Sequence, residues 1–273
     1  MSLIEPDELR RRLTDPNLRI ADVRWQLGAP EAGREAYDGG HIPGAIFLDL
    51  ETDLRSEQGP ARHALPEPVD LRRRMEELGF SDDQTIVAVD DARGAIAARL
   101  WWMLDDLGHA DVRVLHGGLE AWRDLDLPWT DETTDVAAAG SLCSLRDRWS
   151  RAIEVDDLSE ASGRLLDARA PERYRGEVEP IDPAAGHIPG ALNLPFAATL
   201  DDRGRFLDRD ALRAVLGSNG AADTVYCGSG VTACHLALAF RLAGLPAPQL
   251  YAGSWSEWSG LGREVATGPA PGS

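Results

Sequence analysis

Hydrophobic positions along the chain alternate between short apolar runs and longer stretches with helical periodicity. Short apolar runs near 19–23, 85–90 and 112–115 predict strands. The predicted helices between and after these strands lie near 68–79, 94–107 and 118–124. This alternation predicts α/β layers around a mostly parallel sheet.

The pattern occurs twice because the chain contains an internal repeat. The sequence HIPGA at residues 41–45 recurs letter for letter at residues 187–191. An Asp-x-Arg sequence at a predicted strand end also occurs twice, at 22–24 and at 167–169. These matches keep their order along the chain, which chance similarity would not do. The sequence therefore consists of two related halves.

We expect each half to form one domain. The chain has 273 residues, which is enough for two ordinary domains. An N-terminal domain is expected over residues 1–130 and a C-terminal domain over residues 151–273. Residues 131–150 have little periodicity, as is typical of a linker. The predicted fold class is α/β, with two domains that each contain a mostly parallel sheet flanked by helices.

The second half contains a cysteine between a predicted strand and a predicted helix. The strand lies at 223–226, the helix at 233–242, and the loop CGSGVT at 227–232 connects them. Two glycines flank Ser229 and permit a tight loop whose N–H groups turn inward. The partial positive charge at the start of the helix favours the thiolate form of the cysteine. Cys227 is therefore predicted to be a nucleophile rather than a core residue.

The first half has no cysteine in the corresponding loop. Alignment of Gly94 with Gly230 places Asp91 where the second half has Cys227. A carboxylate cannot perform thiol chemistry, so we expect only the second half to be catalytic.

Composition limits the possible partners and the compartment. The formal net charge is −18, and all 28 basic residues are arginine. This charge disfavours binding to nucleic acid or to an anionic membrane surface. No apolar run is long enough for a transmembrane helix, and the N-terminus does not resemble a secretory signal. Three cysteines without CxxC spacing indicate no disulfide scaffold and no zinc site, and they favour a reducing cytoplasm.

Together these motifs resemble the tandem-domain rhodanese sulfurtransferases, and the resemblance covers essentially the whole chain. It rests on the HIPGA turn and the Asp-x-Arg strand end in both halves, and on CGSGVT in the second half alone. The loop is similar to that of 3-mercaptopyruvate sulfurtransferases, whereas thiosulfate-preferring members carry basic residues where Gly228 and Ser229 stand. The resemblance implies 3-mercaptopyruvate as the donor. A thiosulfate:cyanide sulfurtransferase is the alternative, and a non-catalytic sulfide-sensing module is a further one.

The resemblance implies sulfur transfer through a persulfide on Cys227. A small anionic donor would give its sulfur to the thiolate, and cyanide or a thiol, with thioredoxin as one candidate, would remove it. No cofactor and no metal is implied. Backbone N–H groups from Gly228 to Thr232, with Gly230 and Val231 between them, would hold the persulfide anion. The Thr232 hydroxyl would either donate to the persulfide or cap the helix.

The resemblance also implies residues for donor binding and proton transfer. Arg173 matches an arginine that binds the donor's anionic group, and Arg99 is a candidate from the first domain. A second donor-binding arginine of the family falls near 180–182, where this chain has none. Ser229 and His41 match the serine and the histidine of a Ser–His–acid relay.

Two alternatives remain at this point. The histidine of the second HIPGA turn, His187, has no implied catalytic role, so His41 is equally consistent with a structural role. The acid of the relay has no match near Ala32, and Glu31 is the nearest carboxylate. Cys-based phosphatases with a similar fold need an arginine six residues after the cysteine, where this chain has Ala233. The alternative function of a Cys-based phosphatase is therefore disfavoured.

Overall fold

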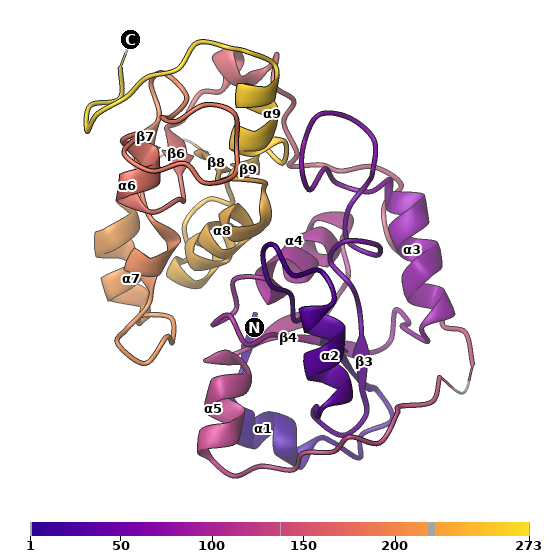
Figure 1. Cartoon of the computed structure of the whole chain (residues 1–273). Coiled ribbons are helices and arrows are strands. Elements are labelled where there is room, and N and C mark those ends of the chain that lie inside the picture. Colours follow the sequence, from indigo (N-terminus) through magenta and orange to yellow (C-terminus); the bar gives the residue numbers. More distant parts are fainter. Residues whose placement is uncertain (1, 137, 218–221, 273) are drawn as a thin grey trace. The chain divides into compact units, whose positions relative to one another are not determined.

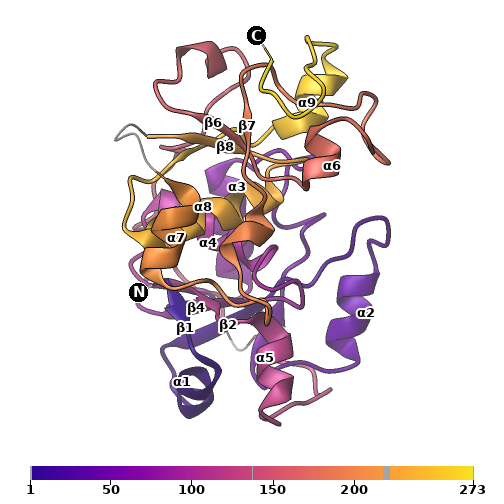
Figure 2. The same cartoon turned by 90° about the vertical axis from the view of Figure 1, so that its left-hand side faces the viewer.

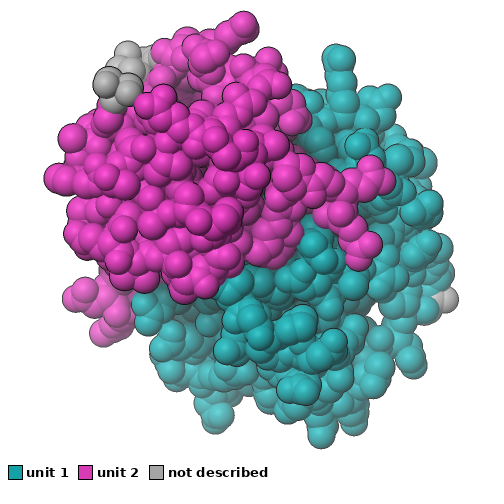
Figure 3. Space-filling model, turned by 45° about the horizontal axis from the view of Figure 1, so that its top comes forward, with its two compact units in different colours: residues 1–55, 66–150 teal, residues 56–65, 151–273 magenta. Residues whose placement is uncertain are grey.

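Each half of the chain builds its own parallel β-sheet, as the alternating pattern predicts (Figure 1). The computed structural model describes residues 2–136, 138–217 and 222–272. The chain divides into two units, coloured separately in Figure 3. Unit 1 comprises residues 1–55 and 66–150, and unit 2 comprises residues 56–65 and 151–273. The predicted α/β fold class is confirmed.

The sheet of unit 1 has the strand order β1-β5-β4-β2-β3, and its strands pair in parallel. The strands are β1 (Leu3–Ile4), β2 (Leu18–Asp22), β3 (Ala45–Phe47), β4 (Thr85–Val89) and β5 (Val112–Leu115). The helices are α1 (Pro6–Arg11), α2 (Ala32–Asp38), α3 (Pro68–Glu77), α4 (Ala97–Leu107) and α5 (Gly118–Asp124).

Helices cover both faces of this sheet. In Figures 1 and 2, α1 and α5 lie on one side of β4 and α4 lies on the other. The first side is packed with apolar side chains from the helices and the strands, among them Leu9, Trp122 and Val87. All five residues of β4 are buried, which explains their continuous apolar run in the sequence.

The sheet of unit 2 is smaller and has the order β7-β6-β8-β9, again in parallel. The strands are β6 (Leu165–Asp167), β7 (Leu192–Asn193), β8 (Thr224–Tyr226) and β9 (Gln249–Leu250). The helices are α6 (Pro171–Tyr174), α7 (Arg209–Leu216), α8 (Val231–Ala243) and α9 (Ser254–Gly260), with short 3₁₀ helices η1 (Leu158–Glu160) and η2 (Phe196–Thr199). Among these described elements, α8 is largely buried, and its many alanines and leucines explain why.

Unit 2 also contains a segment from the first half of the chain, residues 56–65. A backbone hydrogen bond from Ser56 N to Ala64 O, 3.0 Å long, closes this segment into a loop. The N–H of Arg62 donates to Ser256 Oγ of α9 over 3.1 Å. The sequence pattern did not predict this membership, because the segment has no repeat counterpart and no regular periodicity.

Residues 131–150, which the sequence predicts to be a linker, group with unit 1. Ala137 lies outside the described residues. The N–H of Leu142 donates to Glu76 Oε1 over 2.7 Å, and Arg146 Nη1 donates to Asp106 O over 2.6 Å. These contacts fix an irregular segment along the helices of unit 1.

The Asp-x-Arg sequences form the same buried ion pair in both units. Arg24 Nη2 lies 2.8 Å from Asp22 Oδ2, and Arg169 Nη2 lies 2.6 Å from Asp167 Oδ2. Each arginine also donates to a backbone carbonyl, that of Gly40 in unit 1 and that of Gly186 in unit 2. The repeated pair therefore stabilises the strand end and the turn before HIPGA, which gives it a structural role.

Candidate active site

The carboxyl end of β8 positions the predicted nucleophile. Tyr226 ends the strand, opposite Asp167 of β6, so Cys227 is the first residue beyond the edge of the sheet. The N–H of Cys227 donates to Ser254 Oγ over 3.1 Å, and its carbonyl accepts from Trp255 N over 3.0 Å. These bonds to the start of α9 fix the backbone on both sides of a side chain that is only 2% exposed.

The loop needs a glycine where it meets α8. Gly230 is the N-cap residue of the helix and has a φ of 77°. A Cβ at this position would lie 2.5 Å from the carbonyl oxygen of Ala252, which is far inside van der Waals contact. Gly230 therefore allows the chain to turn from the strand into α8 against a neighbouring backbone.

The equivalent position in unit 1 is Asp90, and the sequence alignment to Asp91 is wrong by one residue. Val89 pairs with Asp22 as Tyr226 pairs with Asp167. The carbonyl of the residue after each strand accepts a backbone N–H from the helix that follows the next strand, that of Leu119 in α5 for Asp90 and that of Trp255 in α9 for Cys227. Three residues separate Asp90 from its glycine, Gly94, whereas two separate Cys227 from Gly230. The first loop is thus longer by one residue, which a gapless alignment from the glycine cannot show.

Asp90 shows what this type of loop can hold. Its carboxylate is completely buried and accepts four backbone N–H groups, those of Ala92, Gly94, Ile96 and Ala97, over 2.7–3.0 Å. Burial raises the pKa of Asp90, and the four N–H groups oppose that rise. The loop after β4 is therefore a preorganised anion site that its own side chain fills.

Cys227 occupies the same position in the loop after β8. An anionic sulfur on this residue can receive N–H groups from the loop and from the first turn of α8, which has no intrahelical acceptors for them. Val231 is the first residue of α8 and is buried, and Thr232 is the second. The N-cap is Gly230, and no side chain caps the helix, so the described structure does not show Thr232 as a cap.

Ser229 and His63 form a buried pair beside this loop. The distance from His63 Nδ1 to Ser229 Oγ is 2.7 Å, and the residues are 1% and 7% exposed, respectively. His63 comes from the loop 56–65 of unit 2, 166 residues away in sequence. His63 is not among the site residues that the sequence predicts. The feature of the sequence that could have indicated it is that His63, unlike His41, has no counterpart in the repeat.

The residue that contacts Ser229 in unit 2 is His63, and the implied relay role of His41 stays a prediction. His41 stacks on Tyr37 with ring centroids 3.9 Å apart, and its Nδ1 lies 2.9 Å from Tyr37 O rather than on Glu31. His187 repeats this arrangement with a neighbouring tyrosine, at 3.7 Å and 2.8 Å. Two histidines in the same repeated environment indicate a structural role for both.

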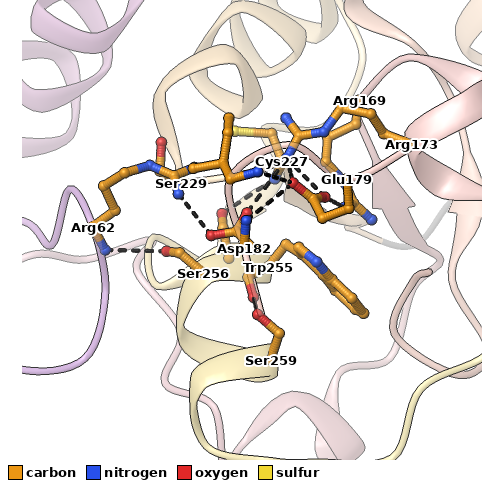
Figure 4. A network of polar contacts seen from close by, with 12 residues as sticks. Arg62, Arg169, Arg173, Glu179, Asp182, Cys227, Ser229, Trp255, Ser256 and Ser259 are labelled. Carbon is orange, nitrogen blue, oxygen red and sulfur yellow. Dashed lines mark hydrogen bonds and ion pairs between the residues drawn. The ribbon is translucent and has the colours of Figure 1, made fainter. Parts of the chain in front are cut away.

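Charged side chains gather beside Cys227, among them those of Arg62, Arg173 and Asp182 (Figure 4). Arg173 Nη2 lies 2.7 Å from Glu179 Oε1 and 3.4 Å from Asp182 Oδ2. Arg62 Nη1 lies 2.6 Å from Asp182 Oδ1. A Cβ added to Gly228 would lie 3.3 Å from a guanidinium nitrogen of each arginine. Two cations therefore lie against Gly228, the residue that follows Cys227.

The remaining predicted residue, Arg99, lies in α4 of unit 1 and is completely buried. Its assignment to donor binding stays a prediction. Within the described ranges, no group of three or more His, Cys, Asp or Glu residues is arranged to hold a metal ion.

The chain is similar in sequence to a known domain family and to proteins named as sulfurtransferases. The family described as Rhodanese-like domain matches residues 5–125 and 152–261. A Pseudomonas aeruginosa protein named probable 3-mercaptopyruvate sulfurtransferase is 44% identical over 280 residues, covering 97% of this chain and 98% of the relative. Thiosulfate sulfurtransferase of Rattus norvegicus is 33% identical over 263 residues, covering 92% of this chain and 88% of the relative.

A solved structure shows similarity over the same length. The 3-mercaptopyruvate sulfurtransferase from Leishmania major superposes with a TM-score of 0.85 at 30% sequence identity. The match covers 95% of this chain and 74% of that chain.

Proposed function

Because this chain belongs to the rhodanese family, with a rhodanese-like domain in each half, we propose that it is a 3-mercaptopyruvate sulfurtransferase that carries sulfur on Cys227. Sulfurtransferase relatives match nearly its whole length. The observation that supports the donor is the contact between His63 and Ser229 beside the cysteine loop. This donor needs a proton transfer, and that pair can supply one.

In the first step, the Cys227 thiolate attacks the sulfur of 3-mercaptopyruvate. The new bond is S–S, the broken bond is C–S, and the bonding electrons of C–S stay on the leaving carbon as an enolate. That carbon gains the proton of the donor's thiol, so the products are pyruvate and a Cys227 persulfide anion. Backbone N–H groups of the loop, from Gly228 to Thr232, stabilise this anion as those of unit 1 stabilise Asp90.

The proton moves through Ser229 and His63. The hydroxyl of Ser229 donates its proton to the leaving carbon and regains one from the imidazole 2.7 Å away. The imidazole in turn takes up the proton of the donor's thiol, so neither side chain gains or loses a proton overall. Both groups are buried, so water does not compete with them for the proton. In this proposal, the hydroxyl of Thr232 donates a hydrogen bond to the persulfide.

In the second step, an acceptor removes the outer sulfur and restores the thiolate. Cyanide attacks it to give thiocyanate, and a thiol gives a new persulfide; thioredoxin is a thiol acceptor of suitable chemistry. We place the protein in a reducing, cytoplasmic compartment because Cys227 must remain a free thiol between cycles. Among the described helices, none combines the length and apolar character needed to cross a membrane.

Thiosulfate is the second candidate donor, since a thiosulfate sulfurtransferase is among the relatives. It transfers its outer sulfur to the thiolate and leaves as sulfite, without any proton transfer. Gly228 and Ser229 supply no positive charge for this doubly charged anion. Since Arg62 and Arg173 place positive charge beside Gly228, charge alone does not separate the two donors, and mercaptopyruvate is preferred in this proposal because it alone uses the proton transfer that His63 and Ser229 can supply.

A comparison of donors tests this proposal. We expect kcat/KM with mercaptopyruvate to exceed that with thiosulfate when cyanide is the acceptor. A preference for thiosulfate would reject the proposed donor, and no thiocyanate from either donor would reject the sulfurtransferase itself. The Cys227→Ser variant is the control for uncatalysed transfer.

A further inference from the structure

Arg62 approaches the cysteine loop from a segment that belongs to the other half of the sequence. Its backbone N–H is fixed to Ser256 Oγ at 3.1 Å, and its Nη1 to Asp182 Oδ1 at 2.6 Å. Its Nη2 lies 3.3 Å from the position that a Cβ of Gly228 would take. The guanidinium is therefore held against the residue that follows Cys227.

Arg173 approaches the same glycine from α6. Its Nη1 also lies 3.3 Å from the Cβ position of Gly228, and its Nη2 pairs with Glu179. The Nε of Arg173 is buried and has no hydrogen-bond partner within the part of the chain that the structure describes. A buried donor in this state is costly unless a ligand satisfies it. Arg173 thus retains hydrogen-bonding capacity next to the nucleophile.

Two buried carboxylates hold the two arginines in place and partly neutralise their positive charge. The side chains of Glu179 and Asp182 are 3% and 4% exposed, and Asp182 bridges both guanidinium groups with its two oxygens. Figure 4 shows these four side chains gathered beside Cys227. This anchoring fixes the two planar guanidinium groups before a ligand binds, which lowers the entropic cost of binding.

We propose that Arg62 and Arg173 together bind the carboxylate of the sulfur donor beside Cys227, an arrangement called here the arginine clamp. The inference rests on the proposed function and names the group that orients its donor. A guanidinium offers two parallel N–H groups that match the two oxygens of a carboxylate. Arg62 thereby supplies a second donor-binding cation, although the stretch 180–182 contains no arginine.

The arginine clamp predicts effects of opposite sign on carboxylate binding when Arg62 and its partner Asp182 are replaced. Replacement of Arg62 by methionine removes one cation, so attraction of a carboxylate to Cys227 should fall. Replacement of Asp182 by asparagine keeps the size and removes a neutralising charge, so attraction should rise. If the ion pair only anchored the loop 56–65, both substitutions would break the same contact and act in the same direction.

Alkylation of Cys227 measures this attraction without any sulfur transfer. Iodoacetate and iodoacetamide form the same C–S bond with loss of iodide, and they differ in the carboxylate. We expect the iodoacetate-to-iodoacetamide rate ratio at Cys227, followed by peptide mass spectrometry, to fall about tenfold or more in Arg62→Met. The ratio should rise in Asp182→Asn and fall less in Arg62→Lys, which keeps the charge but loses the planar fork.

A second ion pair on the same stretch provides matched controls. Arg175 and Glu177 form a pair of 2.7 Å, and both are more exposed than the arginine clamp. Arg175→Met and Glu177→Gln change the net charge by the same amounts and should leave the ratio unchanged.

The turnover assay separates this inference from the proposed function. We expect the KM for mercaptopyruvate and the inhibition constant of pyruvate to rise about tenfold or more in Arg62→Met, with a smaller change in kcat. An unchanged alkylation ratio in both Arg62 variants, or shifts of the same sign in Arg62→Met and Asp182→Asn, would overturn the arginine clamp. Failure of the wild-type protein to transfer sulfur would reject the proposed function, whatever the ratio.

Discussion

At the residue scale, chemistry depends on a few side chains whose neighbours differ between the two halves. Cys227 and Asp90 occupy the same position after a strand, yet one is the proposed nucleophile and the other a buried carboxyl group that accepts four backbone N–H groups. His41 and His187 occupy equivalent positions and make equivalent contacts, whereas His63 has no counterpart and contacts Ser229. Differences between the repeats therefore identify function better than similarities do.

The histidines give a prediction at this scale. His63→Gln should lower kcat with mercaptopyruvate about a hundredfold, because proton transfer loses its partner. Turnover with thiosulfate should change little, because that donor needs no proton. Steady-state assays with both donors check this expectation, and an equal loss with both donors would contradict the proton-transfer role.

His41→Gln should act on stability instead. The substitution removes the ring that stacks on Tyr37 at 3.9 Å, so thermal unfolding should begin at a lower temperature. The donor preference of the folded protein should be that of the wild type. His187→Gln is the matched control, and a selective loss of mercaptopyruvate turnover in His41→Gln alone would show that His41 takes part in the chemistry.

Gly230 gives a second prediction at the residue scale. Gly230→Ala places a Cβ 2.5 Å from Ala252 O at a φ of 77°, so it should cost about 1–3 kcal/mol of stability and distort the loop. Urea unfolding and turnover should both show the loss. Gly190→Ala is a suitable comparison, because its φ is 84° and a Cβ there has nothing within 4 Å. Equal effects of the two substitutions would show that strain alone, and not the contact with Ala252, is responsible.

At the element scale, the recurring unit is a parallel strand, a loop and a helix. β4 leads into α4 and β8 leads into α8, and in the first of these loops backbone N–H groups donate to the side chain of the first residue after the strand. The sequence predicted these elements well, because their apolar runs and glycines are local signals. It misplaced the unit 1 equivalent by one residue, since an insertion in a loop leaves no periodicity to reveal it.

Asp90 tests the anion-binding property of this unit. Asp90→Asn replaces one carboxylate oxygen by an NH₂ group, which cannot accept the N–H groups of Ile96 and Ala97. We expect a loss of about 2–4 kcal/mol in the free energy of unfolding, with turnover per folded molecule nearly unchanged. Chemical denaturation measures the loss. Asp91→Asn, at an exposed position, should be neutral, and a similar loss in both variants would contradict the assignment.

At the scale of the whole molecule, a segment of one half of the sequence completes the site of the other half. The loop 56–65 brings Arg62 and His63 to the cysteine loop of unit 2. The sequence could not predict these contacts, because residues 166 positions apart share no local pattern. The fold, the repeat and the proposed nucleophile follow from local signals, whereas the neighbours of the cysteine loop follow from tertiary packing.

The charge of the whole chain gives a further prediction. A net charge of −18 repels an anionic donor over long distances, and salt screens exposed charges more than buried ones. Since the arginine clamp is mostly buried, kcat/KM for mercaptopyruvate should rise severalfold as ionic strength increases from about 10 mM to about 150 mM. A neutral alkylating agent serves as the control. A fall in kcat/KM over this range would show that the local cations, not the net charge, dominate the approach.

The central claim is that Cys227 carries the transferred sulfur, and intact-protein mass spectrometry without an acceptor tests it most directly. After exposure to mercaptopyruvate, the wild-type protein should gain the mass of one sulfur atom, located at Cys227 by peptide analysis and lost again on addition of cyanide. Cys227→Ser should gain none, while Cys143→Ser and Cys234→Ser should behave as the wild type. Absence of the added sulfur in the wild type, or its location on another cysteine, would contradict the account.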